Sequence, residues 1–142
     1  MQQDGLGYTL HQLVFIIDQQ SNEALRRQLG VGFSQYKILN AARHSLGLKQ
    51  NDIARYLGQT EASVSRQIKL MKAEGLLSVQ VEPENRRARS IVLTDKGADL
   101  ARRCIEVLEH AHANVFGSLS YAEQKMMREL VERLTTKANT KK

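Results

Sequence analysis

The residues with the clearest chemical pattern are short hydroxyl and basic side chains in the middle of the chain. Ser63, Ser65 and Arg66 lie close together, and residues 86–89 include three arginines. Arginine can donate two hydrogen bonds to the O6 and N7 atoms of guanine, and a serine hydroxyl can contact bases or phosphates. Arginine can also enter a narrow, negatively charged minor groove. These residue types favour contacts with double-stranded DNA, provided that the fold presents them on one surface.

The charge distribution agrees with a polyanionic partner. The 142 residues carry 21 Lys and Arg against 15 Asp and Glu, a net charge of +6. Ten basic and five acidic residues lie between Tyr36 and Ser90, so the excess is concentrated in the middle of the chain. A basic surface attracts nucleic acid, although a charged helix face and a charged turn can also serve only to keep a protein soluble.

Hydrophobic spacing predicts the helices that would position these residues. Apolar side chains at three- and four-residue spacings predict helices at residues 8–29, 35–44, 50–57, 61–74, 95–116 and 121–134. Ser34, Thr60, Thr94 and Ser120 are the expected N-caps, and Ser120 forms a capping box with Glu123. Residues 135–142 are expected to be a frayed basic tail.

The spacing changes to a two-residue alternation between the fourth and fifth helices. Leu77, Val79 and Val81 alternate with polar residues, a break follows at residues 83–85, and a second strand is expected to begin near Ser90. This pattern predicts a β-hairpin with Arg86, Arg87 and Arg89 at its tip. Two short helices followed by a basic hairpin are typical of a winged helix-turn-helix.

We therefore expect a mainly α fold of the α+β winged helix-turn-helix class, with a wing of two to three strands. Residues 34–97 would form the DNA-binding region of a single domain over residues 1–142. Residues 8–33 and 98–137 would be dimerisation helices, because the apolar faces of 8–29 and 121–134 have no partner in a small winged unit. The expected assembly is a homodimer.

The order of these motifs resembles the MarR family of winged-helix transcription regulators. Three stretches carry the resemblance: Gln50–Gly58, Ser63–Leu76, and Pro83–Gly97, where the wing runs into Leu-Thr-x-x-Gly and a long helix. The resemblance implies a cytoplasmic DNA-binding regulator, most often a repressor of a pseudo-palindromic operator. It also implies that Arg87 enters the minor groove. Asn85 stands where the family usually has an acidic residue.

The candidate sites follow from the residue pattern and the resemblance together. The DNA-binding candidates are Lys49, Gln50, Thr60, Ala62, Ser63, Ser65, Arg66, Lys69, Arg86, Arg87 and Arg89. By resemblance, a small aromatic or phenolic effector would bind in a cleft between the dimerisation and DNA-binding regions. His11, Phe15, Tyr36 and His44 could line that cleft, or could have packing or surface roles.

Other classes of function find less support in the sequence. No nucleophile elbow, phosphate-binding Gly-rich loop or HExxH pattern occurs, so we expect neither an enzyme nor a cofactor. His110 and His112 point about 200° apart around a helix and cannot share a metal within one chain. The longest apolar run, residues 13–17, is far shorter than the roughly 18 residues of a membrane span, so no membrane partner is expected.

Two alternatives remain open at this point. The winged helix could be a protein-interaction module whose basic wing contacts an acidic protein. Cys104, the single cysteine, could make the protein a redox-responsive regulator, although its place on the apolar stripe of the fifth helix favours a core residue. A lone cysteine and a polar start without a signal-peptide pattern favour the cytoplasm.

Overall fold

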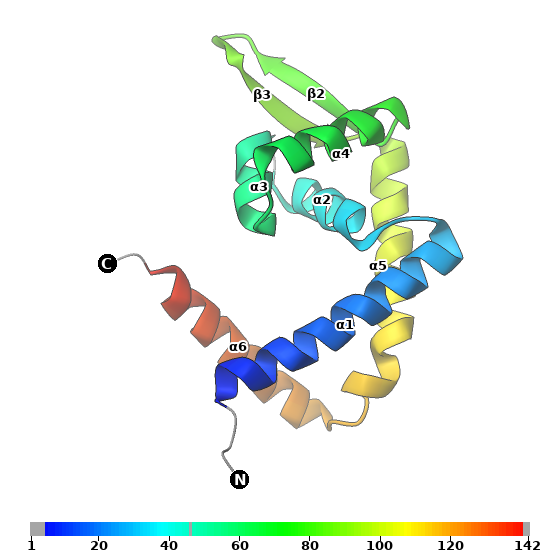
Figure 1. The fold of residues 1–142 in the computed structure, drawn as a ribbon, viewed down its shortest axis with the longest axis vertical. Coiled ribbons are helices and arrows are strands. Elements are labelled where there is room, and N and C mark those ends of the chain that lie inside the picture. The colour runs from blue at the N-terminus through cyan, green and yellow to red at the C-terminus, as the bar shows by residue number, and fades with distance from the viewer. Residues whose placement is uncertain (1–4, 46, 141–142) are drawn as a thin grey trace.

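A computed structural model describes residues 5–45 and 47–140, apart from the side chains of residues 82 and 86–88. Within them the chain forms six helices and a three-stranded antiparallel sheet (Figure 1). The elements in chain order are α1 (Leu6–Leu29), α2 (Phe33–His44), β1 (Leu48–Lys49), α3 (Gln50–Leu57), α4 (Glu61–Ala73), β2 (Leu77–Glu82), β3 (Asn85–Leu93), α5 (Asp95–Phe116) and α6 (Tyr121–Asn139). The predicted winged helix-turn-helix class is confirmed. In this part of the chain, no helix combines the length and the apolar character that a membrane span needs.

The sheet places β3 between β1 and β2. Leu77 pairs with Leu93, Gln80 with Ser90, and Leu48 of β1 with Ile91. The prediction that the second strand begins near Ser90 is wrong, because β3 already begins at Asn85. The hairpin extends beyond the core there, so its residues lack the alternation of apolar and polar side chains that marks a half-buried strand. Residues 86–89 consequently belong to β3 rather than to the turn.

Two clusters of buried side chains hold the fold together. The first fills the winged unit and includes Ile38, Ile53, Val64, Ile68, Met71, Leu77, Ile91 and Ala101. The second, made by Leu25, Val31, Cys104 and Leu108, joins α1 to α5. Because α5 contributes to both clusters, this long helix links the winged unit to the arm that α1 and α5 form below it (Figure 1).

Most of the predicted helix caps are confirmed. The hydroxyl oxygens of Thr60, Thr94 and Ser120 accept hydrogen bonds from the backbone N–H groups of Ser63, Gly97 and Glu123, at 3.1, 3.0 and 3.1 Å. Each of these caps closes within its own helix, so the local sequence is sufficient to predict it.

Three helix ends differ from the prediction. The first helix begins at Leu6, and α2 begins at Phe33, so Ser34 lies inside the first turn and is not the N-cap. The Asn22 side chain of α1 accepts a hydrogen bond from the Phe33 N–H at 3.1 Å and caps α2 from another helix. At the other end, α6 continues to Asn139 where a frayed tail was expected. Lys141 and Lys142 lie outside the described residues.

The end of α4, the base of the hairpin and the start of α5 meet at one junction. The Thr94 hydroxyl donates to the Gly75 carbonyl at 2.6 Å, and the Thr94 N–H donates to the Leu76 carbonyl at 3.1 Å. The Lys96 ammonium donates to the Glu74 carbonyl at 2.8 Å. A Cβ atom at Gly97 would collide with the Leu76 carbonyl oxygen. The Leu-Thr-x-x-Gly motif therefore has a structural role, which is to hold α4, β3 and α5 together.

Replacing Gly97 tests this junction. We expect Gly97→Ala to lower the free energy of unfolding by about 1 to 3 kcal/mol, because a backbone carbonyl in a packed turn cannot move aside easily. The control is Gly7→Ala in α1, where a Cβ would meet nothing within 4 Å. The control should leave stability unchanged or raise it by up to about 1 kcal/mol. Urea denaturation followed by circular dichroism measures both, and equal stability of Gly97→Ala and the parent would contradict the role of the junction.

Candidate nucleic-acid interface

A groove of about 650 Å³ lies between α4 and the β-hairpin. Its lining comes from the start of α3, one face of α4 and the two long strands: Lys49, Gln50, Asn51, Glu61, Ser65, Ile68, Lys69, Lys72, Val79, Asn85, Arg89 and Ile91. Five of the DNA-binding candidates, Lys49, Gln50, Ser65, Lys69 and Arg89, thus come together on one concave surface. We call this surface the α4–wing groove.

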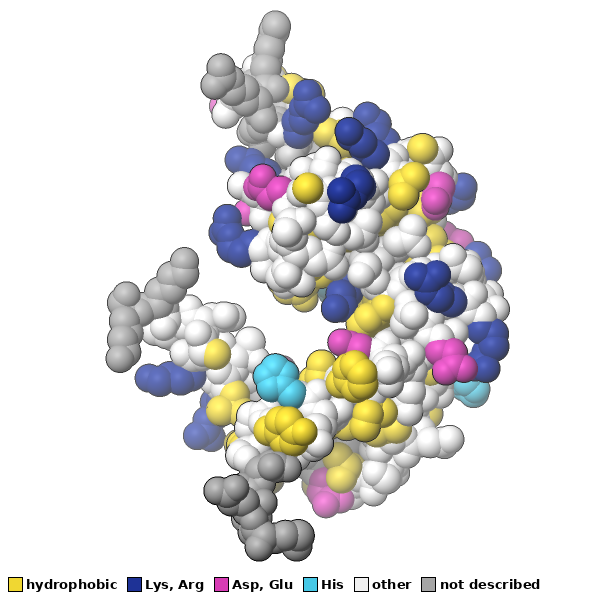
Figure 2. All heavy atoms as spheres, viewed as in Figure 1, with side chains coloured by type: hydrophobic (Ala, Val, Ile, Leu, Met, Phe, Trp, Pro, Cys, Tyr) yellow, Lys and Arg dark blue, Asp and Glu magenta, His cyan; other side chains and the backbone are white. Residues whose placement is uncertain are grey.

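The α4–wing groove carries an excess of positive charge. Lys49, Lys69, Lys72 and Arg89 are all exposed, and Glu61 is the one acid among the lining residues that the structure describes. In the described part of the chain, none of the four cations forms an ion pair with a carboxylate. A concave surface lined by unneutralised charge of one sign concentrates the field and attracts a polyanion. Lys and Arg side chains are spread over the winged lobe in the upper part of Figure 2.

The remaining candidates on α4 divide between two of its faces. Ala62 and Arg66 are exposed. They lie next to Ser65 and Lys69 on the outer side of the helix. Ser63 lies on the opposite flank from Ser65, because residues two positions apart on an α-helix are separated by about 200°. The structure therefore does not bring Ser63 to the α4–wing groove. Thr60, the N-cap of α4, is exposed beside the α4–wing groove.

Ser63 instead belongs to a polar network between α2 and α4. The Gln59 side chain accepts hydrogen bonds from the Gln67 amide at 2.9 Å and from the Ser63 hydroxyl at 3.4 Å. The Gln59 amide donates in turn to the Ser34 hydroxyl at 3.4 Å. This network fixes the turn before α4 against the start of α2. The sequence does not predict this network, because residues 34, 59 and 67 are neighbours only in the fold.

Two further groove residues were not predicted from the sequence. Lys72 lies one turn after Lys69, and this spacing was a signal that could have identified it. Asn51 lines the groove from the first turn of α3, next to Gln50. The side chains of Arg86 and Arg87 lie outside those that the structure describes, and only their backbone is placed, in β3.

A second pocket, of about 430 Å³, lies between α1, α2 and α5. Its lining is mainly apolar and aromatic: Ile17, Ser21, Phe33, Tyr36, Ile105, Leu108, Glu109, His112, Ala113 and Phe116. We call it the α1–α5 pocket. The Phe33 and Tyr36 rings stack with centroids 5.9 Å apart, and His112 meets Phe116 edge-on at 6.1 Å.

Only Tyr36 among the four effector-site candidates lines the α1–α5 pocket. His11 and Phe15 are exposed on a face of α1 roughly a third of a turn from Ile17 and Ser21, and His44 is exposed at the end of α2. Sequence analysis did not identify His112 as a pocket residue. Its Nε2 atom lies 3.0 Å from the Ser21 hydroxyl of α1, a contact between positions 91 residues apart.

The ionisable groups of this pocket have identifiable environments. Burial raises the pKa of the Tyr36 phenol, with smaller contributions from Cys104 and Glu109 that also raise it and one from Arg43 that lowers it. Tyr36 is therefore neutral at pH 7 and can donate a hydrogen bond.

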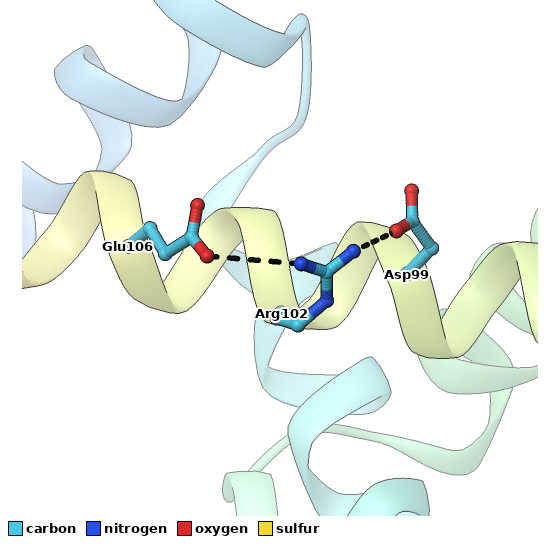
Figure 3. A network of polar contacts seen from close by, with 3 residues as sticks. All are labelled: Asp99, Arg102 and Glu106. Atoms are coloured by element: carbon cyan, nitrogen blue, oxygen red, sulfur yellow. Dashed lines mark hydrogen bonds and ion pairs between the residues drawn. The ribbon is translucent and has the colours of Figure 1, made fainter.

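Outside the pocket, Arg102 contacts Asp99 and Glu106 on the exposed surface of α5 (Figure 3). Such surface pairs are screened by solvent and contribute little to stability.

Cys104 lies in the core of the arm. Its side chain is fully buried with Leu25 and Leu108, and burial raises the pKa of its thiol to about 11. The thiolate is the nucleophilic form of cysteine, and it is a minor species more than three pH units below such a pKa. The Cys104 sulfur is therefore protonated and inaccessible, which disfavours the redox-responsive alternative.

This environment predicts that Cys104 is inert in the native protein. Iodoacetamide at pH 7.5 should modify it at least about a hundredfold more slowly in the folded protein than in 6 M guanidinium chloride, where the thiol regains an ordinary pKa. Intact-mass spectrometry over time gives both rates. Rapid labelling of the native protein would contradict the assignment and restore the redox alternative.

The comparisons with known proteins agree with this geometry. Residues 29–88 match the model of the MarR family. The HTH-type transcriptional repressor Rv2887 of Mycobacterium tuberculosis is 24% identical over 129 residues, which cover 91% of this chain and 92% of the relative. Rv2887 has also been solved in complex with DNA, with a TM-score of 0.76 at 23% identity over 93% of this chain and 98% of that one.

Two further solved structures share the fold. The apo form of wild-type MarR from E. coli has a TM-score of 0.82 at 19% identity, and covers 94% of this chain and 98% of its own. Rv2887 in complex with p-aminosalicylic acid has a TM-score of 0.79 at 23% identity, over 93% and 99% of the two chains. The matched segment, the winged fold and the wing motif agree: residues 29–88 are similar to the MarR family, and the chain shares the fold of MarR and Rv2887.

Proposed function

We propose that the protein is a homodimeric repressor that binds a pseudo-palindromic DNA operator and is released from it by a small-molecule effector. The observation that carries this proposal is the α4–wing groove, where four exposed cations surround a serine on a helix-turn-helix. The second helix of that motif enters a major groove with its N-terminal residues against the base edges. In this chain that helix is α4.

The contacts divide by chemistry into base contacts and phosphate contacts. Ser65 and Arg66 lie in the first half of α4, where they would reach base edges. Lys49, Gln50, Thr60, Lys69, Lys72 and Arg89 surround them and would meet phosphates, which position the protein without reading sequence. Glu61 would be repelled by phosphates, and at a base edge it would accept a hydrogen bond from the N4 amino group of cytosine. Arg87 would extend the contacts into the minor groove beside the wing, and Arg86 would meet phosphates.

The exposed apolar surface of α1 and α6 supports a homodimer. Phe15 of α1 and Tyr121 of α6 are 63% and 84% exposed, and α6 buries none of its residues against the rest of the chain. Figure 2 shows hydrophobic side chains gathered on the lower part of the molecule, over α1 and α6. Monomeric proteins rarely expose such a surface. A two-fold dimer would present two copies of α4 and would therefore need two half-sites of inverted sequence.

The α1–α5 pocket and the relatives support an effector. The pocket has the size and the aromatic lining that suit a small aromatic molecule. Rv2887, a relative that is named a repressor, has been solved both with DNA and with p-aminosalicylic acid.

The proposed function is tested by recovering fragments of the host genome on the tagged protein and sequencing them. A repressor should enrich a few loci that share an inverted repeat. Its affinity for those loci should also exceed its affinity for random duplex by about a thousandfold or more. Uniform sampling of the genome would contradict the proposal and would favour the protein-interaction module instead.

The recognition helix gives a sharper expectation for single residues. Arg66→Ala should weaken operator binding by about 1 to 3 kcal/mol and unevenly across operator variants, because it removes a base contact. Lys69→Ala should weaken binding to all sequences alike and reduce the salt slope by about 1, as expected for one lost phosphate contact. The control is Arg102→Ala, which removes a cation from the exposed surface of α5 and should leave DNA binding unchanged. Fluorescence anisotropy measures all three, and equal, sequence-independent losses from Arg66→Ala and Lys69→Ala would contradict the base contact.

The dimer prediction concerns the apolar face of α6. Light scattering at micromolar concentration should give twice the chain mass of 16.1 kDa. Leu130→Asp combined with Leu134→Asp should shift the protein toward the monomer, since these exposed leucines lie one turn apart. Circular dichroism checks that the winged unit remains folded. A monomer mass for the parent protein would remove the dimer and the inverted-repeat expectation together.

A further inference from the structure

We propose that the α1–α5 pocket takes a positively charged aromatic amine, with the Glu109 carboxylate as its ionic partner, and discriminates against aromatic carboxylates. This ligand class rests on the effector site proposed above and specifies the charge of the molecule that fills it. The structural basis is a mainly apolar, aromatic pocket in which Glu109 is the one charged residue among the described lining residues.

The walls of the pocket suit an aromatic cation. Phe33, Tyr36 and Phe116 contribute three aromatic rings from α2 and α5. Ring faces carry a negative quadrupole and attract cations. The Lys37 ammonium already lies 4.8 Å from the centroid of the Phe33 ring, so this arrangement occurs in the protein itself.

The charges around the pocket disfavour a carboxylate. No Lys or Arg is among the described lining residues, and the nearby Lys37 ammonium lies against the Phe33 ring rather than in the lining, so a carboxylate ligand would have no lining cation to pair with. It would also meet the like charge of Glu109. The Ser21 hydroxyl occupies the Nε2 side of His112 at 3.0 Å, which removes one hydrogen-bonding position from the imidazole. Arg43, whose charge lowers the pKa of Tyr36, lies two turns further along α2 and does not line the pocket.

The polar groups of the pocket place the amine at one end of the ligand. Glu109 and His112 lie three residues apart on α5, so their side chains are neighbours on one face of the helix. Tyr36 approaches from α2 as a neutral phenol. A ligand ring would lie between the aromatic walls with its ammonium group directed at Glu109 and a hydroxyl within reach of Tyr36 or His112. The expected class is a small aromatic amine with a polar ring substituent.

Three ligands of the same size and different charge test this class: 4-hydroxybenzylamine, 4-hydroxybenzyl alcohol and 4-hydroxybenzoate. Isothermal titration calorimetry with the full chain at pH 7 should show the amine binding about tenfold or more tightly than the benzoate, with the alcohol between them. Glu109→Gln should weaken amine binding about three- to fivefold and leave alcohol binding unchanged, as expected for an ion pair to the exposed Glu109 carboxylate. The matched control is Glu106→Gln, because Glu106 lies one turn away, contacts Arg102 and does not line the pocket (Figure 3).

A second variant localises the binding. Ala113→Phe places a ring inside the pocket and should abolish binding of all three ligands, while a thermal melt confirms that the protein is folded. The inference is overturned if the benzoate binds best, if Glu109→Gln and Glu106→Gln behave alike, if Ala113→Phe still binds the amine, or if none of the three ligands binds at millimolar concentration.

Operator binding measured beside the calorimetry separates this inference from the proposed function. Binding of the amine that depends on Glu109 but leaves operator affinity unchanged would support the pocket assignment and contradict the effector role. Release of the operator by the benzoate and not by the amine would support an effector-controlled repressor and overturn the charge preference. The two claims can therefore fail independently.

Discussion

The contact between Gly97 and the Leu76 carbonyl is the constraint on which the rest of the structure depends. At this point the end of α4, the base of the wing and the first turn of α5 lie within hydrogen-bond distance of one another. Each hydrogen bond there contributes only about 1 kcal/mol, but together with the close packing of Gly97 they fix the angle between α4 and the hairpin. The width of the α4–wing groove follows from that angle. The groove that we propose to bind a DNA duplex therefore has a width set by this junction.

The same junction connects the groove to the second pocket. Starting at Asp95, α5 contributes Ala101 to the core of the winged unit, and Cys104 and Leu108 to the core of the arm. His112 of the pocket lies roughly 22 Å along this helix from Gly97, at about 1.5 Å per residue. A second connection runs through α2, because Phe33 lines the pocket while the Ser34 hydroxyl beside it accepts a hydrogen bond from Gln59 in the turn before α4. The pocket and the groove thus share α5 and α2 as common framework.

The features that the sequence predicts correctly depend on nearby residues. Thr60, Thr94 and Ser120 cap their own helices, and Val64, Ile68 and Met71 are buried at helical spacing. The features that the sequence does not predict have a partner in a distant part of the chain. The cap of α2 comes from Asn22 of α1, Ser63 is held by Gln59 and Gln67, and His112 is placed by Ser21. Periodicity shows that a helix has an apolar face, but it does not show which polar residue at the edge of that face turns toward a cavity. The sequence therefore indicates His11 and Phe15 as effector-site residues, whereas Ile17 and Ser21 line the pocket.

The central claim is that the α4–wing groove is the surface that binds DNA, and amide hydrogen exchange tests it most directly. Exchange of the full chain is measured alone and with a DNA duplex recovered from the host genome. The structure predicts slower exchange, on DNA binding, at the first half of α4 and at the turn between β2 and β3, with little change in α6. Slower exchange confined to α1 and α6, with α4 and the hairpin unchanged, would contradict it.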